Sequence, residues 1–545
     1  MSENTDAADG VEAMPPAPPG WDAKAWRTYQ TRLMRKRRAK AGGGWSLAPL
    51  AWAEAARPGA AAPVSGLVLG AVLASGVAAA VLLGDGLGPG LLLAVVPALV
   101  AVYAAARTAG RKVRPWTVLW AVGCLALLAV PTLRASGWPA ALALLAAVMA
   151  AALALHGSRS WQGILAGPFF GFVDSAVLGV RWVWTGLRSR GSGSRDRWLP
   201  VAKAVLVALV LLGLFGTLFA SADAAFADLL SGLTPDVGGL DGPVRFLLFL
   251  LGAVLAIAAA RTAAAPSRWD RIEVAPGKAR SRVEWALPLI VLDLLFAGFN
   301  AVQLAVLFGG YRKVLEATGL TYSEYARQGF WQLLWATLLT LAVIALALRW
   351  APRGGAGDRR LVRSVLGTLC ALTLVVVASA LHRMNLYVDA YGLTRLRVSV
   401  AGVELWLGLV VVLIMAAGAF GARWLPRAVA GSAVAAVLAF GLVSPDGLIA
   451  EGNVSRYEQD HKIDLAYFQS LSADAVPGLD RLPEPQRSCA LRGINQDLVR
   501  AGDDVPWYAM SLGERRARRI LRERPVTASY AQCARLGTFG SRIEY

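Results

Sequence analysis

The feature that most constrains this chain is a series of apolar runs, each about twenty residues long. In a helix, a run of this length crosses the hydrocarbon core of a bilayer, which is about 30 Å thick. Apolar residues make up 56% of the 545 residues and charged residues only 17%, less charge than a soluble protein of this length carries. We therefore predict an all-α integral membrane protein with about eleven transmembrane helices, within a range of ten to twelve. The runs lie near residues 64–84, 88–106, 116–133, 138–156, 199–220, 243–260, 285–308, 329–348, 361–381, 402–420 and 425–443.

The formal net charge is +19, and the basic residues are distributed along the chain as the predicted topology requires. If the N-terminus lies inside, the inner segments hold about 32 Lys and Arg residues and the short outer loops about seven. This asymmetry obeys the positive-inside rule, which orients membrane proteins through their short loops. It predicts a plasma-membrane protein with a cytoplasmic N-terminus and an extracytoplasmic C-terminus. The basic residues are thus accounted for without a nucleic-acid partner, and the lipid bilayer is the expected environment.

The spans divide the chain into five regions. Residues 1–63 are Pro-rich and then basic, which predicts a disordered cytoplasmic segment. Its basic stretch is either a helix on anionic headgroups or a solvated tail. Residues 64–156 hold the first four helices, and 199–443 hold a core of about seven. Between them, 157–198 is rich in Trp and predicts an interfacial cytoplasmic helix, with a twelfth span as the alternative. Residues 444–545 form an extracytoplasmic helical tail.

Three polar residues interrupt the apolar run at 285–308. Asp293 and Asn300 are seven residues apart and therefore share one helix face, and Gln303 lies about one turn further on. An ionisable group at this depth is costly unless it faces a cavity or a partner. The three residues are therefore a candidate functional polar core. The alternative is an interhelical hydrogen bond that only fixes packing.

Two predicted outer loops, 309–328 and 382–401, carry a second set of polar residues. Cations, carboxylates, tyrosines and one histidine would meet at one face, where they could bind an anionic headgroup or another lipid-linked envelope component through charge-assisted bonds. They could equally form a belt of ion pairs that locks the loops together. No metal-ligand spacing occurs, so neither a metal nor a cofactor is expected. The set comprises Tyr322, Glu324, Tyr325, Arg327, His382, Arg383, Tyr387, Asp389, Tyr391, Arg395, Arg397 and Glu404.

The tail carries Cys489 and Cys533, the two cysteines outside the spans. In an oxidising exterior they could form a disulfide, and unpaired thiols are the alternative. Ser511 and Glu514 have the spacing of a capping box, which predicts a helix that begins there. Two further short helices are expected over 464–471 and 491–500.

Several motifs are familiar as a set. The turn Leu307–Gly310, the stretch Thr321–Leu333, the stretches Leu381–Met384 and Tyr391–Arg397, and the segments Ile463–Tyr467 and Asp474–Pro477 resemble polytopic bacterial membrane proteins of domain-of-unknown-function family 4173. The related family 4153 is the second choice. The resemblance covers roughly 200–480 and implies a membrane location and a shared core, but no established activity. The abundance of Ala, Gly and Arg is typical of a high-GC actinobacterium.

Two classes of function follow. The first, which we favour, is a non-enzymatic protein, transporter-like, a sensor or an envelope scaffold, with its working core in 285–404. The alternative is a membrane enzyme acting on a lipid-linked or cell-envelope substrate at the outer face. A transporter predicts that Asp293 lines a water-accessible cavity. An enzyme predicts that His382, Asp389 and Glu404 lie within hydrogen-bond reach of one another.

Overall fold

The computed structural model describes residues 22, 56–189, 215, 219, 241–272, 281–309, 330–351, 355–502 and 504–536. Every regular element in these ranges is a helix, and no strand occurs among them, as the apolar pattern predicts. Most of the predicted N-terminal segment, the predicted span at 199–220 and nearly all of the predicted loop at 309–328 lie outside the described residues.

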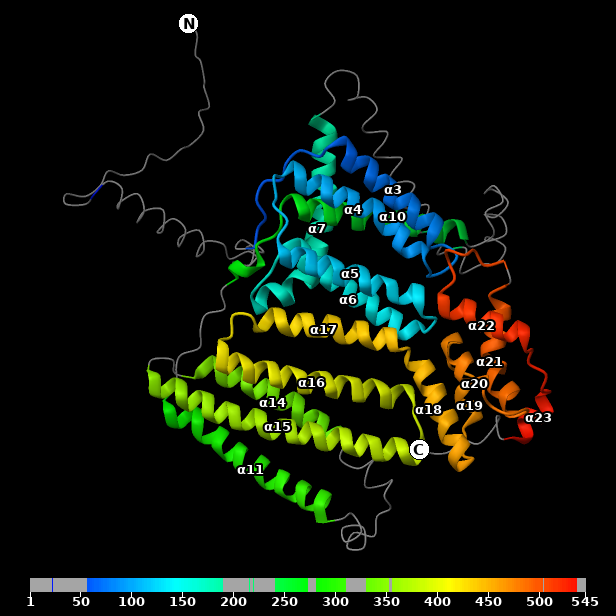
Figure 1. Ribbon diagram of the computed structural model, residues 1–545. Coiled ribbons are helices and arrows are strands. Elements are labelled where there is room, and N and C mark those ends of the chain that lie inside the picture. Colours follow the sequence, from blue (N-terminus) through cyan, green and yellow to red (C-terminus); the bar gives the residue numbers. More distant parts are fainter. Residues whose placement is uncertain are drawn as a thin grey trace. The chain divides into compact units, whose positions relative to one another are not determined.

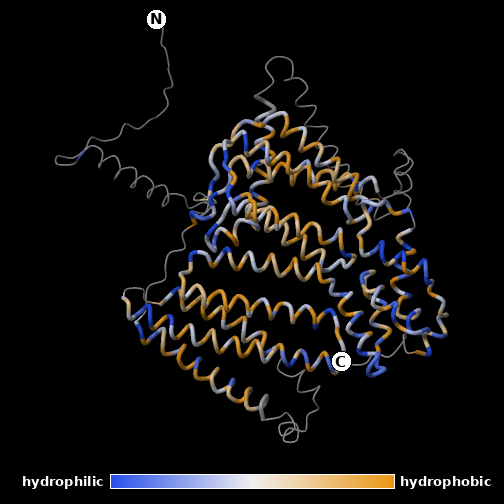
Figure 2. Tube along the Cα trace, viewed as in Figure 1, coloured by the Kyte–Doolittle hydropathy of each residue, from blue (hydrophilic) through white to orange (hydrophobic). Residues whose placement is uncertain are grey.

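The long helices follow the apolar runs (Figure 1). Helices α3, α4, α7 and α10 pack against one another, and so do α11, α14, α15 and α16, while α17 packs on α5, α6 and α16. Figure 2 shows that their residues are largely hydrophobic along the helices and more hydrophilic near the helix ends. Their bounds are α3 Gly66–Leu82, α4 Gly90–Thr108, α5 Pro115–Leu133, α6 Gly137–His156, α7 Trp161–Ser189, α10 Asp241–Ala264, α11 Arg282–Gly309, α14 Phe330–Trp350, α15 Ala356–Tyr391, α16 Arg395–Phe420 and α17 Leu425–Val443.

The predicted number of eleven spans is corrected by the structure. In the described ranges, nine helices are long and apolar enough to cross a membrane, or ten if the bent helix α7 counts as one span. Helix α3 falls short because the Ser65 hydroxyl caps its start and the helix stops at Leu82, which leaves 17 residues. That is about 26 Å of helix, less than a typical hydrocarbon core. The other missing run, 199–220, lies outside the described residues.

A compact group of helices follows α17, and we call it the C-terminal module. It contains α18 (Pro445–Asp460), α19 (Leu465–Phe468), α20 (Val476–Leu479), α21 (Gln486–Arg500), α22 (Leu512–Glu523) and α23 (Tyr530–Arg535). Its own apolar core includes Ile449, Phe468, Leu479 and Leu491, each at most 1% exposed. Figure 2 shows a larger share of hydrophilic residues here than along the long helices. The predicted helical tail is therefore a folded unit of short helices.

The C-terminal module contacts three turns between long helices. Asp474 accepts hydrogen bonds from the backbone N–H groups of Ala135 and Ser136, at the start of α6, at 3.0 and 3.2 Å. The Tyr508 hydroxyl donates to Asp85 in the turn between α3 and α4. Asn453 exchanges two hydrogen bonds with the backbone of Leu393 in the turn between α15 and α16. These turns share one end of the helices, which we call the module end.

The opposite end of the long helices, which we call the basic end, is held by a different set of bonds. Arg111 donates to the carbonyl oxygen of Ala263 at 2.7 Å, and Arg282 pairs with Asp358 at 2.6 Å. Arg427 donates to the carbonyl oxygen of Ser158 at 3.1 Å. Most basic residues beside the long helices lie at this end, in the segments 107–114, 159, 261–271, 282, 349–363 and 423–427.

Helix α7 was predicted to lie at the inner interface. Its halves, Trp161–Gly171 and Val173–Gly186, meet at 56°, and by length and composition they could form one broken span. The interfacial position and the alternative of a further span both stay predictions. Trp182 donates to the carbonyl oxygen of Ala62 at 2.8 Å, and Ser175 bonds to Thr262 near the basic end. Helix α10 starts at the module end, where Arg245 pairs with Asp85.

Gly513 of α22 allows the module to approach the turn before α6. A Cβ atom at this position would lie 2.0 Å from Asp474 Oδ1 and 3.2 Å from the backbone nitrogen of Ala135. The change Gly513→Ala should therefore lower the Tm and destabilise the protein by about 1–3 kcal/mol, although alanine is the better helix former. Thermal unfolding of the purified full chain measures this.

Gly137→Ala is the matched control, because Gly137 opens α6 and a Cβ there would meet nothing within 4 Å. We expect that variant to unfold at the wild-type temperature or slightly above it. Equal Tm values for the two variants would contradict the close docking of the module.

Candidate functional site

The candidate polar core lies where α11 packs against α15. Asn300 donates to the carbonyl oxygen of Leu372 at 3.0 Å, and Gln303 accepts a hydrogen bond from Arg383 at 2.9 Å. Asp293 is 9% exposed, and its Oδ1 has no hydrogen-bond partner among the described residues. Two of the three residues thus make the interhelical bonds of the packing alternative. Asp293 does not line the cavity described below, and its role stays a prediction.

The predicted outer-face set is only partly described. Tyr322, Glu324, Tyr325 and Arg327 lie outside the described residues. The predicted polar loop at 382–401 is instead two helices, because α15 continues to Tyr391 and α16 begins at Arg395. The extra turns of α15 stay helical because Arg383 and Met384 are buried against neighbouring helices. Only residues 392–394 form the turn.

The three residues expected to converge in an enzyme lie at different places. Asp389 is exposed near the end of α15, and His382 lies seven residues earlier in the same helix. That spacing separates their Cα atoms by about 10 Å along the axis, beyond hydrogen-bond reach for these short side chains. Glu404 is fully buried in α16, and its Oε1 lies 3.1 Å from the Thr337 hydroxyl of α14. No catalytic constellation is formed by this set.

A cavity of about 770 Å³ lies at the module end, where α14, α15 and α16 meet the C-terminal module. Three cations line it, Arg397, Arg456 and Lys462, with Asp464 as the carboxylate. The Asp464 side chain is engaged as the N-cap of α19, where it accepts the Tyr467 N–H. Thr394 and Asn453 add uncharged polar groups to the wall. The remaining lining residues are apolar or aromatic, namely Trp331, Met384, Tyr387, Ala390, Tyr391, Leu393, Leu396, Val400, Ile463, Tyr467 and Phe468.

Arg397 is the most enclosed of the three cations, at 7% exposed. Its guanidinium lies 4.1 Å from the centre of the Tyr387 ring and 5.7 Å from that of Tyr391, and it donates to the carbonyl oxygen of Gly392. The two rings are themselves 5.0 Å apart in an edge-to-face arrangement. A cation held between aromatic rings is fixed in direction and partly desolvated, which strengthens its attraction for an anion.

Arg395, the first residue of α16, joins α16 to the C-terminal module beside the cavity. Its guanidinium forms a bidentate pair with Asp446 of α18, at 2.8 and 2.6 Å, and its backbone N–H donates to the Tyr467 hydroxyl. Asp446 is fully buried and also accepts from the backbone N–H of Ser472. Burial alone would raise the pKa of Asp446, but the hydrogen bonds from Arg395 and Ser472 outweigh it and hold that pKa below its ordinary value.

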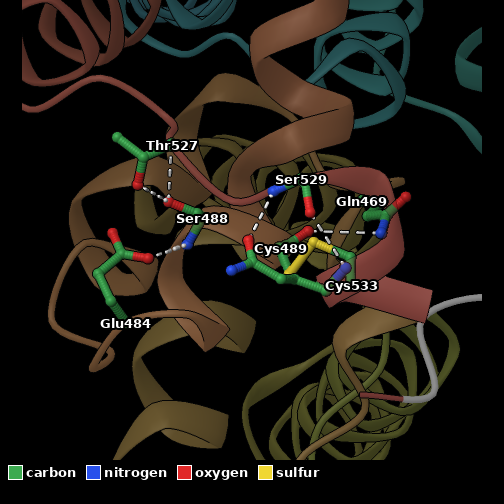
Figure 3. Close-up of a disulfide and its surroundings, with 8 residues drawn as sticks. Gln469, Glu484, Ser488, Cys489, Thr527, Ser529 and Cys533 are labelled. Atoms are coloured by element: carbon green, nitrogen blue, oxygen red, sulfur yellow. Dashed lines mark hydrogen bonds between the residues drawn. A yellow bond between two sulfur atoms is a disulfide. The ribbon is translucent and has the colours of Figure 1, made fainter. Parts of the chain in front are cut away.

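The two cysteines of the tail are joined in a disulfide, the pairing that the sequence left open (Figure 3). It links α21 to α23, and the Cα atoms of Cys489 and Cys533 are 5.4 Å apart. The Gln469 side chain donates to the carbonyl oxygen of Cys489, and Ser488 bonds to Thr527 beside it. The predicted capping box at Ser511 is half formed, because Ser511 accepts the Glu514 N–H while Glu514 pairs with Arg518.

Comparison with known proteins identifies the family. The family model of a domain of unknown function, DUF4153, matches residues 121–482, more than half of the chain. This chain belongs to the DUF4153 family. It is the second of the two families named from the motifs, and membership of family 4173, the first choice, is not shown. No curated protein and no solved structure matches the chain.

The matched region contains all the described residues that line the cavity. It also contains Asp446 and Asp474, the two carboxylates of the module that bond to α16 and to the start of α6. The sequence analysis had placed Tyr387, Tyr391 and Arg397 in its candidate set, and these three do line the cavity. It missed Asn453, Arg456 and Lys462, and it missed Asp446 as the partner of Arg395. The sequence offered only a weak indication of these residues, namely that they follow directly after the last apolar run and so lie on the side predicted for the outer loops.

The Asp446–Arg395 pair predicts how stability depends on pH. A carboxyl group whose pKa is lowered by folding stabilises the fold above its unfolded pKa of about 3.9, and this stabilisation is lost as the pH falls through the folded pKa. At about pH 7, Asp446→Asn should destabilise the protein by about 3 kcal/mol, because it leaves Arg395 without its counter-charge. The difference from wild type in thermal unfolding should shrink as the pH falls below about 4.

Asp497→Asn is the control, because the Asp497 side chain is 69% exposed and, among the described residues, pairs only with Arg500 on the same helix. It should change the Tm little at any pH. A Tm difference for Asp446→Asn that is equal at neutral and acid pH would show that the charge of Asp446 does not stabilise the fold.

Proposed function

We propose that this DUF4153 protein is a non-enzymatic, multi-pass protein of the bacterial plasma membrane that binds an anionic, amphiphilic envelope component at its outer face. In this role it acts as a sensor or scaffold rather than as a catalyst. The observation that carries the proposal is the cavity, which combines three cations with aromatic walls where membrane helices meet the C-terminal module.

The chemistry of the cavity suits a charged headgroup attached to an apolar chain. Arg397, Arg456 and Lys462 provide net positive charge for a phosphate or carboxylate, which would gain charge-assisted hydrogen bonds. Trp331, Met384 and Val400 lie on the side toward the membrane-spanning parts of α14, α15 and α16 and offer apolar contact. Such a division is expected for a site at a membrane interface, where one end of the ligand is wet and the other is in lipid.

The orientation belongs to the same proposal. Basic residues gather at the end opposite the module, which is typical of a cytoplasmic face. The Cys489–Cys533 disulfide favours an oxidising compartment for the module. The cavity and the module then face the exterior, where envelope lipids and lipid-linked precursors are present.

Labelling of intact cells with a membrane-impermeant maleimide tests this orientation. Cys124 and Cys370 would be replaced and the disulfide retained, with single cysteines at Asp389, Asp497 or Arg359, all exposed positions. We expect the first two to react and Arg359→Cys, at the start of α15, to react only after permeabilisation. Reaction of Arg359→Cys alone in intact cells would reverse the topology and refute an outer-face ligand.

Lipid binding tests the ligand class. The purified full chain should bind phosphatidylglycerol more tightly than phosphatidylcholine, as measured by quenching of tryptophan fluorescence with labelled lipid in mixed micelles. Lys462→Gln and Arg397→Gln should each weaken phosphatidylglycerol binding, by about tenfold for Arg397, because a hydrogen bond to a charged group contributes roughly 1.5–3 kcal/mol. Competition by inorganic phosphate distinguishes recognition of free phosphate from recognition of a lipid headgroup.

The matched control is Arg500→Gln, which removes an exposed cation of the same module that does not line the cavity. It should bind like wild type. Equal affinity for the two lipids, or equal losses in all three variants, would refute a specific anion site.

A further inference from the structure

Glu404 lies one helical turn further into the membrane region than the cavity. Val400, which lines the cavity, precedes Glu404 by four residues on the same face of α16, which is about 6 Å along the helix. On the neighbouring helices, Trp331 of α14 and Met384 of α15 also line the cavity. Glu404 is fully buried, and its Oε2 has no hydrogen-bond partner among the described residues.

The hydrogen bonds around Thr337 favour a neutral Glu404. The Thr337 hydroxyl oxygen lies 3.1 Å from the carbonyl oxygen of Leu333 and 3.1 Å from Glu404 Oε1. A hydroxyl carries one proton. If Glu404 were ionised, the two acceptor oxygens would have to share that proton in a bifurcated bond, which leaves each contact weaker than a full hydrogen bond.

A neutral Glu404 satisfies both contacts. Its carboxyl O–H donates to Thr337 Oγ1, and the Thr337 hydroxyl then donates to the carbonyl oxygen of Leu333. An ionised carboxylate at this depth, with one oxygen unpaired, would also carry a large desolvation cost. Hydrogen bonding and burial therefore agree on the protonated form.

Among the described residues, no charged side chain forms an ion pair with Glu404. On α15, His382 and Arg383 lie near its level, and Arg383 is bonded to Gln303 of α11. On α16, Arg397 lies two turns outward and is held against Tyr387. Asp293 lies on α11. Among the other helices packed on α16, α14 and α17 carry their charged residues near their ends, at Arg349 and Arg427. Helix α18 of the module carries Asp446, Glu451, Arg456, Glu458 and Asp460 along its length.

Packing makes the outward direction the short route for a proton. Toward the basic end, a Cβ atom on Gly408 would lie 3.0 Å from the Val377 side chain, so α15 and α16 are in close contact one turn below Glu404. Leu407 is 3% exposed there. From Glu404 to the end of α16 at Phe420 is about 24 Å of helix, against about 6 Å to the cavity.

We propose that Glu404 is a proton-binding site that exchanges its proton with the outer face through the cavity. In the exchange, the O–H bond at Glu404 breaks and the proton passes to water in the cavity, leaving a carboxylate that the reverse step protonates again. The protein would thus carry a protonatable group directly beneath its ligand cavity. This inference goes beyond the proposed function and does not depend on which ligand the cavity holds.

Infrared spectroscopy of the full chain in lipid nanodiscs at neutral pH tests the protonation. Wild type should show a protonated-carboxyl C=O band that is lost in Glu404→Gln. In Thr337→Val the band should remain but shift, because the carboxyl group loses its hydrogen-bond acceptor. Identical spectra for wild type and Glu404→Gln, with both proteins folded, would overturn the proposal.

The route is tested by the rate at which the same band shifts after transfer to heavy water. Val400→Phe places a larger side chain between the cavity and Glu404 and should slow the shift several-fold. Val412→Phe adds the same ring at an exposed position of α16 outside the cavity and should leave the rate unchanged. Equal rates in the two variants would overturn exchange through the cavity.

Discussion

The arrangement at the module end depends on how the backbone groups of the helix turns are satisfied. The first N–H groups of a helix have no partner within the helix and need an acceptor. At the start of α6, that acceptor is Asp474 of the C-terminal module, which bonds to Ala135 and Ser136. At the turn before α16, Asn453 and Tyr467 of the module supply further acceptors. Bonds to backbone groups thus join the module to the membrane helices, together with the Arg395–Asp446 pair and the apolar packing of Leu393 and Val398 on the core of the module.

The position of the cavity follows from this docking. Asp446 pairs with Arg395 and also accepts the Ser472 N–H, so one buried carboxylate ties α16 to the segment after α19. With Arg395 occupied in this way, Arg397 is the neighbouring arginine that faces the cavity, supported by the Tyr387 ring. Two arginines two residues apart thus have different tasks, one in fixing the module and the other in lining the cavity. A substitution of either would act through a different physical effect.

The features that depend on local sequence pattern, above all the positions of the long helices, could be predicted from the sequence. The length of an apolar run predicts a membrane helix, so most spans were located within a few residues. The extension of α15 to Tyr391 was not predicted, because His382, Arg383 and Asn385 are typical of a loop, and only packing against α11 and α14 explains why the helix continues. Likewise, Arg395 and Asp446 are 51 residues apart. A pairing over that distance depends on where the turns meet in space.

The family match ends inside the C-terminal module and so divides it into a matched part and an unmatched part. The DUF4153 region ends at residue 482 and so includes Asp446, Asp474 and every residue that lines the cavity. The disulfide and helices α21 to α23 lie beyond it. Gly513 of this later part sits against Asp474, so the extension covers a contact that the family region already makes with α6. The cavity and the contacts of Asp446 and Asp474 therefore lie inside the matched region, and the disulfide-linked helices lie beyond it.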